Sequence, residues 1–150
     1  MDATDRKILA ELQQDGRLTL TELADRVQLT LSPAHRRLRD LEQRGVISGY
    51  RAMVEPEAVG LGFQALVFVT MREATQAAIS AFEAAVEPLE HIVDAQRLFG
   101  EPDYLLRVVA RDLPHFQQLY DEELSALPGV QRVATTLVMR KVVDGRALPV

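Results

Sequence analysis

Apolar residues near the start of the chain recur at the spacing of a helix with one buried face. Ile8, Leu9 and Leu12 follow one another at intervals of one and three residues. Thr4 and Asp5 precede this run, and Asp15 and Gly16 follow it. Residues that favour helix starts and stops therefore flank the pattern, which predicts a first helix over about residues 5–14.

A second helix begins at a capping box formed by Thr19 and Glu22. The Thr19 hydroxyl and the Glu22 carboxylate can each accept a hydrogen bond from a backbone N–H that the first helical turn leaves free. The apolar positions that this helix would bury are Leu20, Leu23, Ala24 and Val27. The pattern predicts a short amphipathic helix that packs on the first.

Signals for a third helix follow at once. Ser32 is a favourable N-cap, Pro33 suits the first helical position, and Gly45 suits the C-terminal stop, so we predict a helix over about 33–44. Three short helices with a tight connection between the second and third form a helix-turn-helix, whose third helix can enter the major groove of DNA. The apolar stretch at 46–50 is then expected to form a wing.

The rest of the chain switches between strand and helix periodicity in the order βαββαβ. The predicted segments are a strand at 64–72, a helix at 75–87, strands at 92–99 and 103–111, a helix at 113–127 and a strand at 130–143. We therefore predict an α+β chain with a winged helix-turn-helix domain over 1–52, a linker over 53–63, a ferredoxin-like (ACT-like) domain over 64–143 and a tail over 144–150.

The first strand of this second domain is apolar on both faces. Leu66, Phe68 and Thr70 alternate with Val67, Val69 and Met71. Both helices of a βαββαβ unit cover the same sheet face, so the other apolar face needs a different cover, and a partner subunit is the simplest one. A charged substitution such as Val67→Asp is then expected to weaken assembly, and DNA binding with it.

Charge is distributed unevenly along the 150 residues, whose formal net charge is −5. Residues 1–54 carry nine Arg/Lys and eight Asp/Glu, which gives +1, and the remainder carries eight and fourteen, which gives −6. A nearly neutral N-terminal segment followed by an acidic remainder fits a protein that contacts phosphates with one small face, although many enzymes share this asymmetry.

Composition also excludes several kinds of site. The chain has no cysteine, and its three histidines, at 35, 91 and 115, lie far apart, so neither a disulfide nor a metal site is expected, and no cofactor is predicted. No apolar run reaches the 18 or more residues that a membrane span needs, and the N-terminus does not look like a signal peptide. We expect a soluble cytoplasmic protein that does not bind membranes.

The predicted third helix carries side chains suited to reading DNA. Opposite the apolar positions Ala34, Leu38 and Leu41 lies a polar stripe with basic flanks: Ser32, His35, Arg36, Arg37, Arg39, Gln43 and Arg44. Guanidinium groups suit guanine or phosphate, and glutamine suits adenine. We expect His35 and Arg36 near base edges, with Arg37, Arg39 and Arg44 at phosphates. The alternative is an ordinary solvated helix face, because Asp40 and Glu42 interrupt the basic run.

These segments resemble the Lrp/AsnC family, the feast/famine regulators, over nearly the whole chain. The resemblance is carried by residues 5–9, 12–17, 22–24, 35–38 and 41–50, by the loop GEPDYLL at 100–106, and by 127–130 with Thr135 and Thr136. Departures fall in the turn of the helix-turn-helix, where Gln28 stands in place of a common glycine and Leu31 in place of a small residue. They bear on the geometry of the turn more than on its existence.

The resemblance implies a homodimer or octamer that binds double-stranded DNA and senses a small effector, usually an amino acid, held between subunits. Carried over residue by residue, it implies an effector site at Gly100, Asp103, Tyr104, Thr135 and Thr136. Backbone N–H groups, a carboxylate and hydroxyls suit a zwitterion. The same residues are also ordinary in hairpins and strands, and packing alone would explain Tyr104.

Two other functions remain open at this point. Similar chains act as sirohaem decarboxylases, although no pair of acid and base residues here forms a catalytic constellation. An architectural protein that binds DNA without any effector would share the same salt dependence of binding. The sequence favours a sequence-specific transcriptional regulator over both of these, and over an enzyme in particular.

Overall fold

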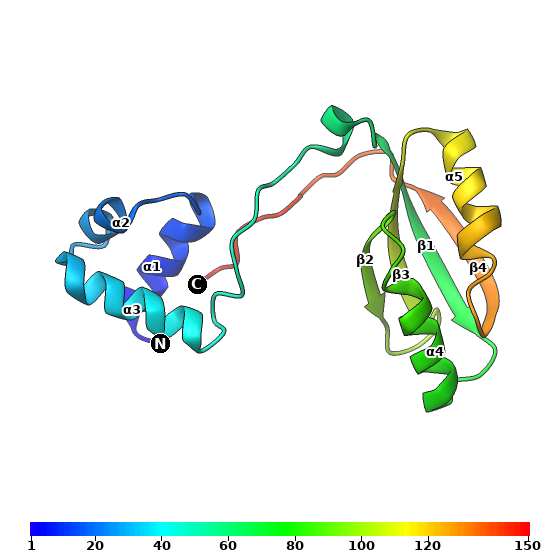
Figure 1. Ribbon diagram of the computed structural model, residues 1–150, viewed down its shortest axis with the longest axis horizontal. Coiled ribbons are helices and arrows are strands. Elements are labelled where there is room, and N and C mark those ends of the chain that lie inside the picture. Colours follow the sequence, from blue (N-terminus) through cyan, green and yellow to red (C-terminus); the bar gives the residue numbers. More distant parts are fainter. The chain divides into compact units, whose positions relative to one another are not determined.

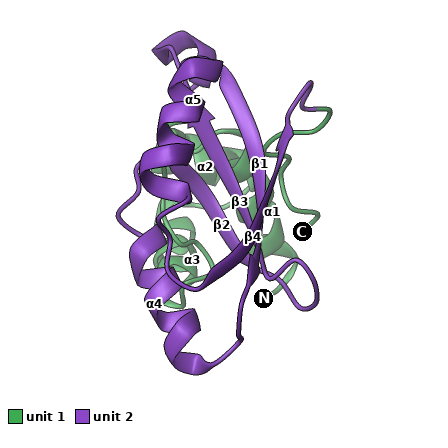
Figure 2. Cartoon of the chain, turned by 90° about the vertical axis from the view of Figure 1, so that its right-hand side faces the viewer, with its two compact units in different colours: residues 1–53, 142–150 green, residues 54–141 purple.

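The structure is a computed structural model that describes residues 1–150. The chain forms two compact units (Figure 2): residues 1–53 together with 142–150, and residues 54–141. The tail therefore belongs to the same unit as the N-terminal helices. None of the helices is both long and apolar enough to span a bilayer.

The first unit contains three helices (Figure 1), α1 (Ala3–Gln14), α2 (Leu20–Arg26) and α3 (Leu31–Gln43). They enclose a small core whose buried members are Ile8, Leu9, Leu23, Val27 and Leu41. The predicted capping box at Thr19 and Glu22 is present, and a second one joins Asp2 to Asp5 at the start of α1. The three predicted helices are thus confirmed.

Helix α3 begins earlier than predicted. Its N-cap is Thr30, so the assignment of that role to Ser32 is wrong, and Pro33 occupies the third helical position. Proline is tolerated there because the first-turn N–H groups have no acceptor within the helix. The predicted stop is confirmed by Gly45, which has φ +68°. Residues 46–50, where we expected a wing, contain no strand: a bend at residues 46 and 47 leads into irregular backbone, and Ile47 packs against the core.

The turn between α2 and α3 contains Gln28 with φ +57°. This left-handed conformation favours glycine, since a β-carbon approaches the following carbonyl there. Gln28, which replaces the common glycine, is therefore a strained residue. The turn forms nevertheless, since the Leu29 N–H donates to the Ala24 carbonyl at 2.9 Å.

The second unit has the predicted βαββαβ order. After a 3₁₀ turn (Pro56–Val59) come β1 (Phe63–Met71), α4 (Gln76–Val86), β2 (Ile92–Arg97), β3 (Tyr104–Ala110), α5 (Leu113–Leu119) and β4 (Val130–Leu137). The strands form one antiparallel sheet in the order β2-β3-β1-β4. Both helices cover the same face of it (Figure 2). The ferredoxin-like fold is confirmed.

Two boundaries in this unit differ from the prediction. β4 ends at Leu137 rather than at residue 143, because its only neighbour β1 begins at Phe63 and the last backbone bond between them joins Val138 N–H to the Gln64 carbonyl. The final helix is also shorter: α5 gives way to a π-helical turn, Tyr120–Leu124. Ser125 N–H donates to the Tyr120 carbonyl at 2.9 Å and closes that turn.

The two faces of β1 have different surroundings. Ala65, Val67 and Val69 are fully buried beneath the helices, whereas Leu66 and Phe68 on the opposite face are partly exposed. Val67→Asp is therefore the wrong change with which to test assembly, because it would place a carboxylate in the unit's own core. The open apolar face is the one that contains Leu66 and Phe68.

The tail adopts a defined position on the first unit. Gln13 pairs with the backbone of Leu148 through two hydrogen bonds: its side-chain amide donates to the Leu148 carbonyl at 3.2 Å and accepts from the Leu148 N–H at 2.6 Å. Gly145, with φ +55°, lies against Met53. The tail thus becomes part of the unit that carries the helix-turn-helix.

Candidate DNA interface and effector cavity

Helix α3 exposes a row of polar side chains that form no hydrogen bond or ion pair within the protein. These side chains lie opposite Ala34 and Leu41, which are buried in the unit. The exposed and unpaired members of the predicted DNA-binding set are Ser32, His35, Arg36, Arg39 and Gln43. Unpaired guanidinium and amide groups on one helix face are available to hydrogen-bond base edges or phosphates.

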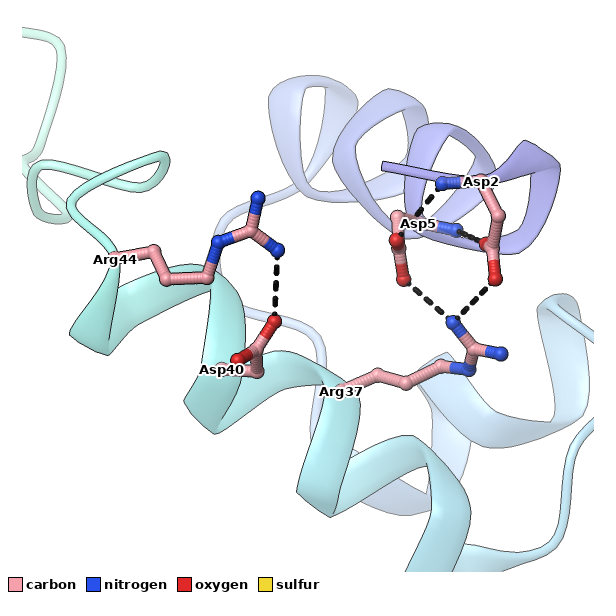
Figure 3. A network of polar contacts seen from close by, with 5 residues as sticks. All are labelled: Asp2, Asp5, Arg37, Asp40 and Arg44. Atoms are coloured by element: carbon pink, nitrogen blue, oxygen red, sulfur yellow. Dashed lines mark hydrogen bonds and ion pairs between the residues drawn. The ribbon is translucent and has the colours of Figure 1, made fainter.

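The other two predicted residues have partners inside the unit (Figure 3). Arg44 pairs with Asp40 at 2.9 Å, and both side chains are about half exposed, so water competes with this ion pair and DNA phosphate can replace it. Arg37 contacts the carboxylates of Asp2 and Asp5, and its side chain points toward the start of α1. Arg26 on α2 pairs with Glu11 on α1 at 3.0 Å.

The segment after α3 is fastened to the same helix. The Tyr50 hydroxyl donates to the Glu42 carboxylate at 3.0 Å. Burial and this bond raise the pKa of Tyr50 to about 12. Glu42, which interrupts the basic run in the sequence, is therefore engaged in anchoring residues 46–50 beside α3.

In the second unit, a small cavity of about 170 Å³ lies at the loop between β2 and β3. Its lining contains the predicted residues Gly100, Asp103 and Tyr104, together with apolar side chains and one arginine: Met71, Ala74, Ile79, Arg97, Leu98 and Phe99. Gly100 has φ +127°, a conformation that a residue with a β-carbon rarely adopts. The volume suits a molecule smaller than a typical drug-sized ligand.

Two of the predicted effector residues have structural partners at this cavity. The Asp103 carboxylate accepts from the Met71 N–H at 2.7 Å and so fastens the loop to the end of β1. Tyr104 is buried, and its hydroxyl donates to Glu83 at 2.8 Å. Burial and then this bond raise the pKa of Tyr104 to about 12. Both residues shape the cavity wall, and Tyr104 also packs against Phe82 at a ring-centroid distance of 4.4 Å.

The two threonines of the predicted effector site lie elsewhere in the chain. Thr135 pairs with Val67 and lines a separate groove of about 660 Å³ beside α5, whereas Thr136 pairs with Leu66 on the open sheet face. Neighbouring strand residues point to opposite faces, so the two side chains cannot line one pocket on the same face. Within one chain, the structure brings together Gly100, Asp103 and Tyr104 but neither threonine.

Each of the two units matches a known protein family. Residues 1–48 match the family model for the winged helix-turn-helix DNA-binding domain, and residues 64–148 match the model for the Lrp/AsnC ligand-binding domain. The chain belongs to the Lrp/AsnC family. It is a sequence-specific DNA-binding transcriptional regulator of that type.

Relatives and solved structures align along nearly their whole length. The chain is 42% identical over 144 residues to the leucine-responsive regulatory protein of Rhizobium meliloti (strain 1021), which covers 96% of this chain and 92% of that protein. It is 33% identical over 150 residues to the DNA-binding transcriptional activator DecR of Escherichia coli (strain K12), covering 100% and 99%. A transcriptional regulator of Neisseria meningitidis, solved in complex with L-Met, superposes with a TM-score of 0.94 at 38% identity, covering 99% and 96%.

Arg97 is the charged residue lining the cavity of this Lrp/AsnC regulator that the sequence did not predict. It lies at the end of β2 directly opposite Tyr104, and its side chain is exposed and unpaired. The signal available in the sequence was a basic residue just before a glycine loop, but assigning it to the cavity requires the β2–β3 register.

Proposed function

We propose that this Lrp/AsnC regulator responds to an amino acid bound in the cavity at Gly100. The observation that supports this most directly is the composition of the cavity wall, which combines an unpaired arginine with apolar side chains around a volume of about 170 Å³. The Neisseria meningitidis regulator, of similar fold, was solved with L-Met.

Each part of an amino acid has a counterpart in this wall. The Arg97 guanidinium suits the α-carboxylate, because it presents paired donors in a fixed fork. The second oxygen of Asp103 is left to accept from the ammonium group, since only one oxygen is bonded to Met71. Met71, Ile79 and Leu98 supply an apolar surface for the ligand side chain, so we expect an apolar amino acid.

A thermal-shift panel of the twenty amino acids tests this proposal. A ligand that binds only the folded state raises the melting temperature by mass action, so one or a few apolar amino acids should do so. Arg97→Gln should reduce that shift strongly, whereas Arg111→Gln, the same change at an exposed arginine outside the cavity, should leave it intact. The proposal fails if no amino acid shifts the transition.

We further propose that the unpaired row on α3 contacts DNA, with His35 and Arg36 nearest the bases. The row is exposed, and its members have no partners in the protein. Arg36→Ala should weaken binding to a duplex selected from a random pool by at least about fivefold, since one bidentate base contact is worth about 1–3 kcal/mol. Arg111→Ala, in the other unit, is the matched control. Equal affinities of the two variants would contradict the interface.

We also propose that copies of the chain pair through the open sheet face to form a dimer. Leu66, Phe68 and Leu105 are apolar neighbours on this face, and β1 and β3 place them side by side. Phe68→Asp should give monomers in sedimentation and weaker operator binding, because two-fold pairing presents two DNA-binding helices. Ala77→Asp, an exposed site on α4, should do neither. The same sedimentation run distinguishes a dimer from an octamer.

A further inference from the structure

Arg37 extends from α3 to the N-terminus of α1 (Figure 3). One guanidinium nitrogen, Nη1, lies 2.8 Å from Oδ2 of Asp2 and 2.7 Å from Oδ1 of Asp5. The Arg37 side chain is 31% exposed and the Asp5 side chain 12%. Asp5 is the one charged residue of the chain that is classed as buried. The contact is therefore partly shielded from solvent, unlike the Arg44–Asp40 pair on the same helix.

The two carboxylates that receive Arg37 are already held in place by the backbone. The Asp2 N–H donates to Oδ2 of Asp5 at 3.0 Å, and the Asp5 N–H donates to Oδ1 of Asp2 at 2.9 Å. All four carboxylate oxygens thus have a donor, two from the backbone and two from Arg37. These backbone bonds are the largest cause of the lowered pKa of each carboxyl, and Arg37 adds to it, so both remain charged near neutral pH.

This arrangement connects the helix that reads DNA to the helix that supports it. Arg37 directly follows His35 and Arg36, the residues proposed to lie nearest the bases. A rotation of α3 about its axis would move their tips away from the base edges, and functional groups need to be held within about 0.5 Å of their productive positions. Apolar contacts through Ala34 and Leu41 are non-directional, whereas two charged hydrogen bonds from one nitrogen fix a direction.

We infer that Arg37 is a positioning residue for DNA recognition, which fixes the rotation of α3 through Asp2 and Asp5 and touches neither bases nor phosphates. This inference rests on the DNA interface proposed above. It also reverses the expected effect of removing an acidic residue on the affinity for DNA. Removal of an acidic residue from a DNA-binding unit normally strengthens binding to phosphate, yet Asp5→Asn should weaken specific binding because Arg37 loses the more buried of its two charged partners.

The test uses the whole 150-residue chain and two probes: the tightest duplex that the unmodified protein selects from a random-sequence pool, and a scrambled duplex of the same length. Asp5→Asn and Arg37→Gln should each lower affinity for the selected duplex at least about tenfold and leave the scrambled duplex nearly unchanged. A general loss of stability would not alter this ratio, provided that binding is measured well below each variant's melting temperature. The salt dependence of binding should be the same as that of the unmodified protein.

Two matched controls define the alternatives. Asp25→Asn removes the same charge from an exposed residue without an Arg37 contact and should not weaken binding. Arg39→Gln removes an unpaired arginine of α3 and should weaken binding to both duplexes if it contacts phosphate, with the salt slope reduced by about one. If Arg39→Gln and Arg36→Ala both change nothing, the proposed interface itself is wrong.

The double variant Asp5→Asn/Arg37→Gln completes the design. If the residues act as one unit, the double variant should bind the selected duplex about as well as either single variant. The inference is overturned if Asp5→Asn binds that duplex as tightly as the unmodified protein or more tightly. It is equally overturned if Arg37→Gln loses affinity for both duplexes with a smaller salt slope, because Arg37 would then be a phosphate contact.

Discussion

In the helix-turn-helix unit, charged side chains connect one helix to another, as in Arg37 with Asp2 and Asp5, and Arg26 with Glu11. In the sheet unit, the helices meet the sheet mainly through apolar side chains such as Phe82 and Phe116. The first unit has a small core around Ile8, Leu23 and Leu41, and the second has a larger one. The same kind of substitution should therefore have different consequences in the two units.

The physical reason for this difference is size. A small three-helix unit buries a smaller fraction of its surface than a larger domain, so caps and ion pairs form a larger share of its stability. The sheet unit buries enough apolar area that removal of one polar contact is a minor loss. The following predictions test this contrast, from the largest expected effect to the smallest.

Phe82→Ala should lower the free energy of unfolding of the sheet unit by about 3–5 kcal/mol, because it leaves a cavity beside Tyr104 in the buried core. Urea unfolding followed by hydrogen exchange locates the loss. Leu113→Ala, at a site that is 49% exposed, is the control and should cost far less. A similar cost at both sites would mean that packing does not dominate this unit.

The free energy of unfolding of the unmodified protein should fall at alkaline pH, and Tyr104→Phe should make this fall smaller. The Tyr104 pKa is raised from its ordinary 10.0 to about 12, so the folded state holds this proton longer than the unfolded state does. Its contribution is fully present below pH 10 and is lost as the pH rises from 10.0 to about 12. Across that window the unmodified protein should lose roughly 3 kcal/mol more of its free energy of unfolding than Tyr104→Phe does.

Urea titrations at several pH values across this window measure the effect. Tyr50, whose pKa is also raised to about 12, is present in both proteins, so the difference between them isolates Tyr104. Equal slopes would show that the Glu83 bond and burial of the phenol do not perturb its ionisation in solution.

Thr19→Ala and Thr75→Ala remove the N-cap residue from one helix in each unit. Thr19 exchanges bonds with Glu22 through both its hydroxyl and its backbone, whereas Thr75 accepts a single bond from the Ala78 N–H at 3.2 Å. We expect a loss of about 1–2 kcal/mol for Thr19 and about 0.5–1 kcal/mol for Thr75. Hydrogen exchange in each unit measures both, and a larger effect at Thr75 would contradict the contrast between the units.

Gln28→Gly should stabilise the helix-turn-helix unit slightly. The left-handed conformation of Gln28 costs about 1 kcal/mol, and the greater freedom of glycine in the unfolded chain offsets part of the gain. We expect a net gain of about 0.5 kcal/mol, read as a small rise in melting temperature. Gln28→Ala retains the β-carbon and should bring no gain, so an equal rise with alanine would exclude backbone strain as the cause.

Much of the fold followed from local patterns. Helix spacing, the capping box at Thr19 and the alternation in β1 are properties of neighbouring residues, and each predicted its element correctly. The start of α3 was placed two residues late, and a larger error fell where an end depends on a distant partner. β4 was predicted to run to residue 143, but it ends at Leu137, close to where its partner β1 begins at Phe63.

The predicted effector site also combined correct and incorrect placements. The sequence placed Gly100, Asp103 and Tyr104 within one loop, and they do line one cavity, but Arg97 joins them only through the pairing of β2 with β3. Thr135 and Thr136 are adjacent in sequence, and yet the strand places them on opposite faces. Spacing along the chain indicates which residues are near one another, but not which face or partner they meet.

Arg37 shows most clearly what the sequence determined and what was left to tertiary structure. Its position within the basic run of the third helix was evident from the residues alone, and that position suggested a phosphate contact. Its orientation toward Asp2 and Asp5 depends on how α1 and α3 pack, which brings Nη1 of Arg37 within 3 Å of two carboxylates that lie 35 and 32 residues earlier in the chain. Charge–charge contacts of this kind are long-range in sequence and short-range in space, so only the folded chain decides them.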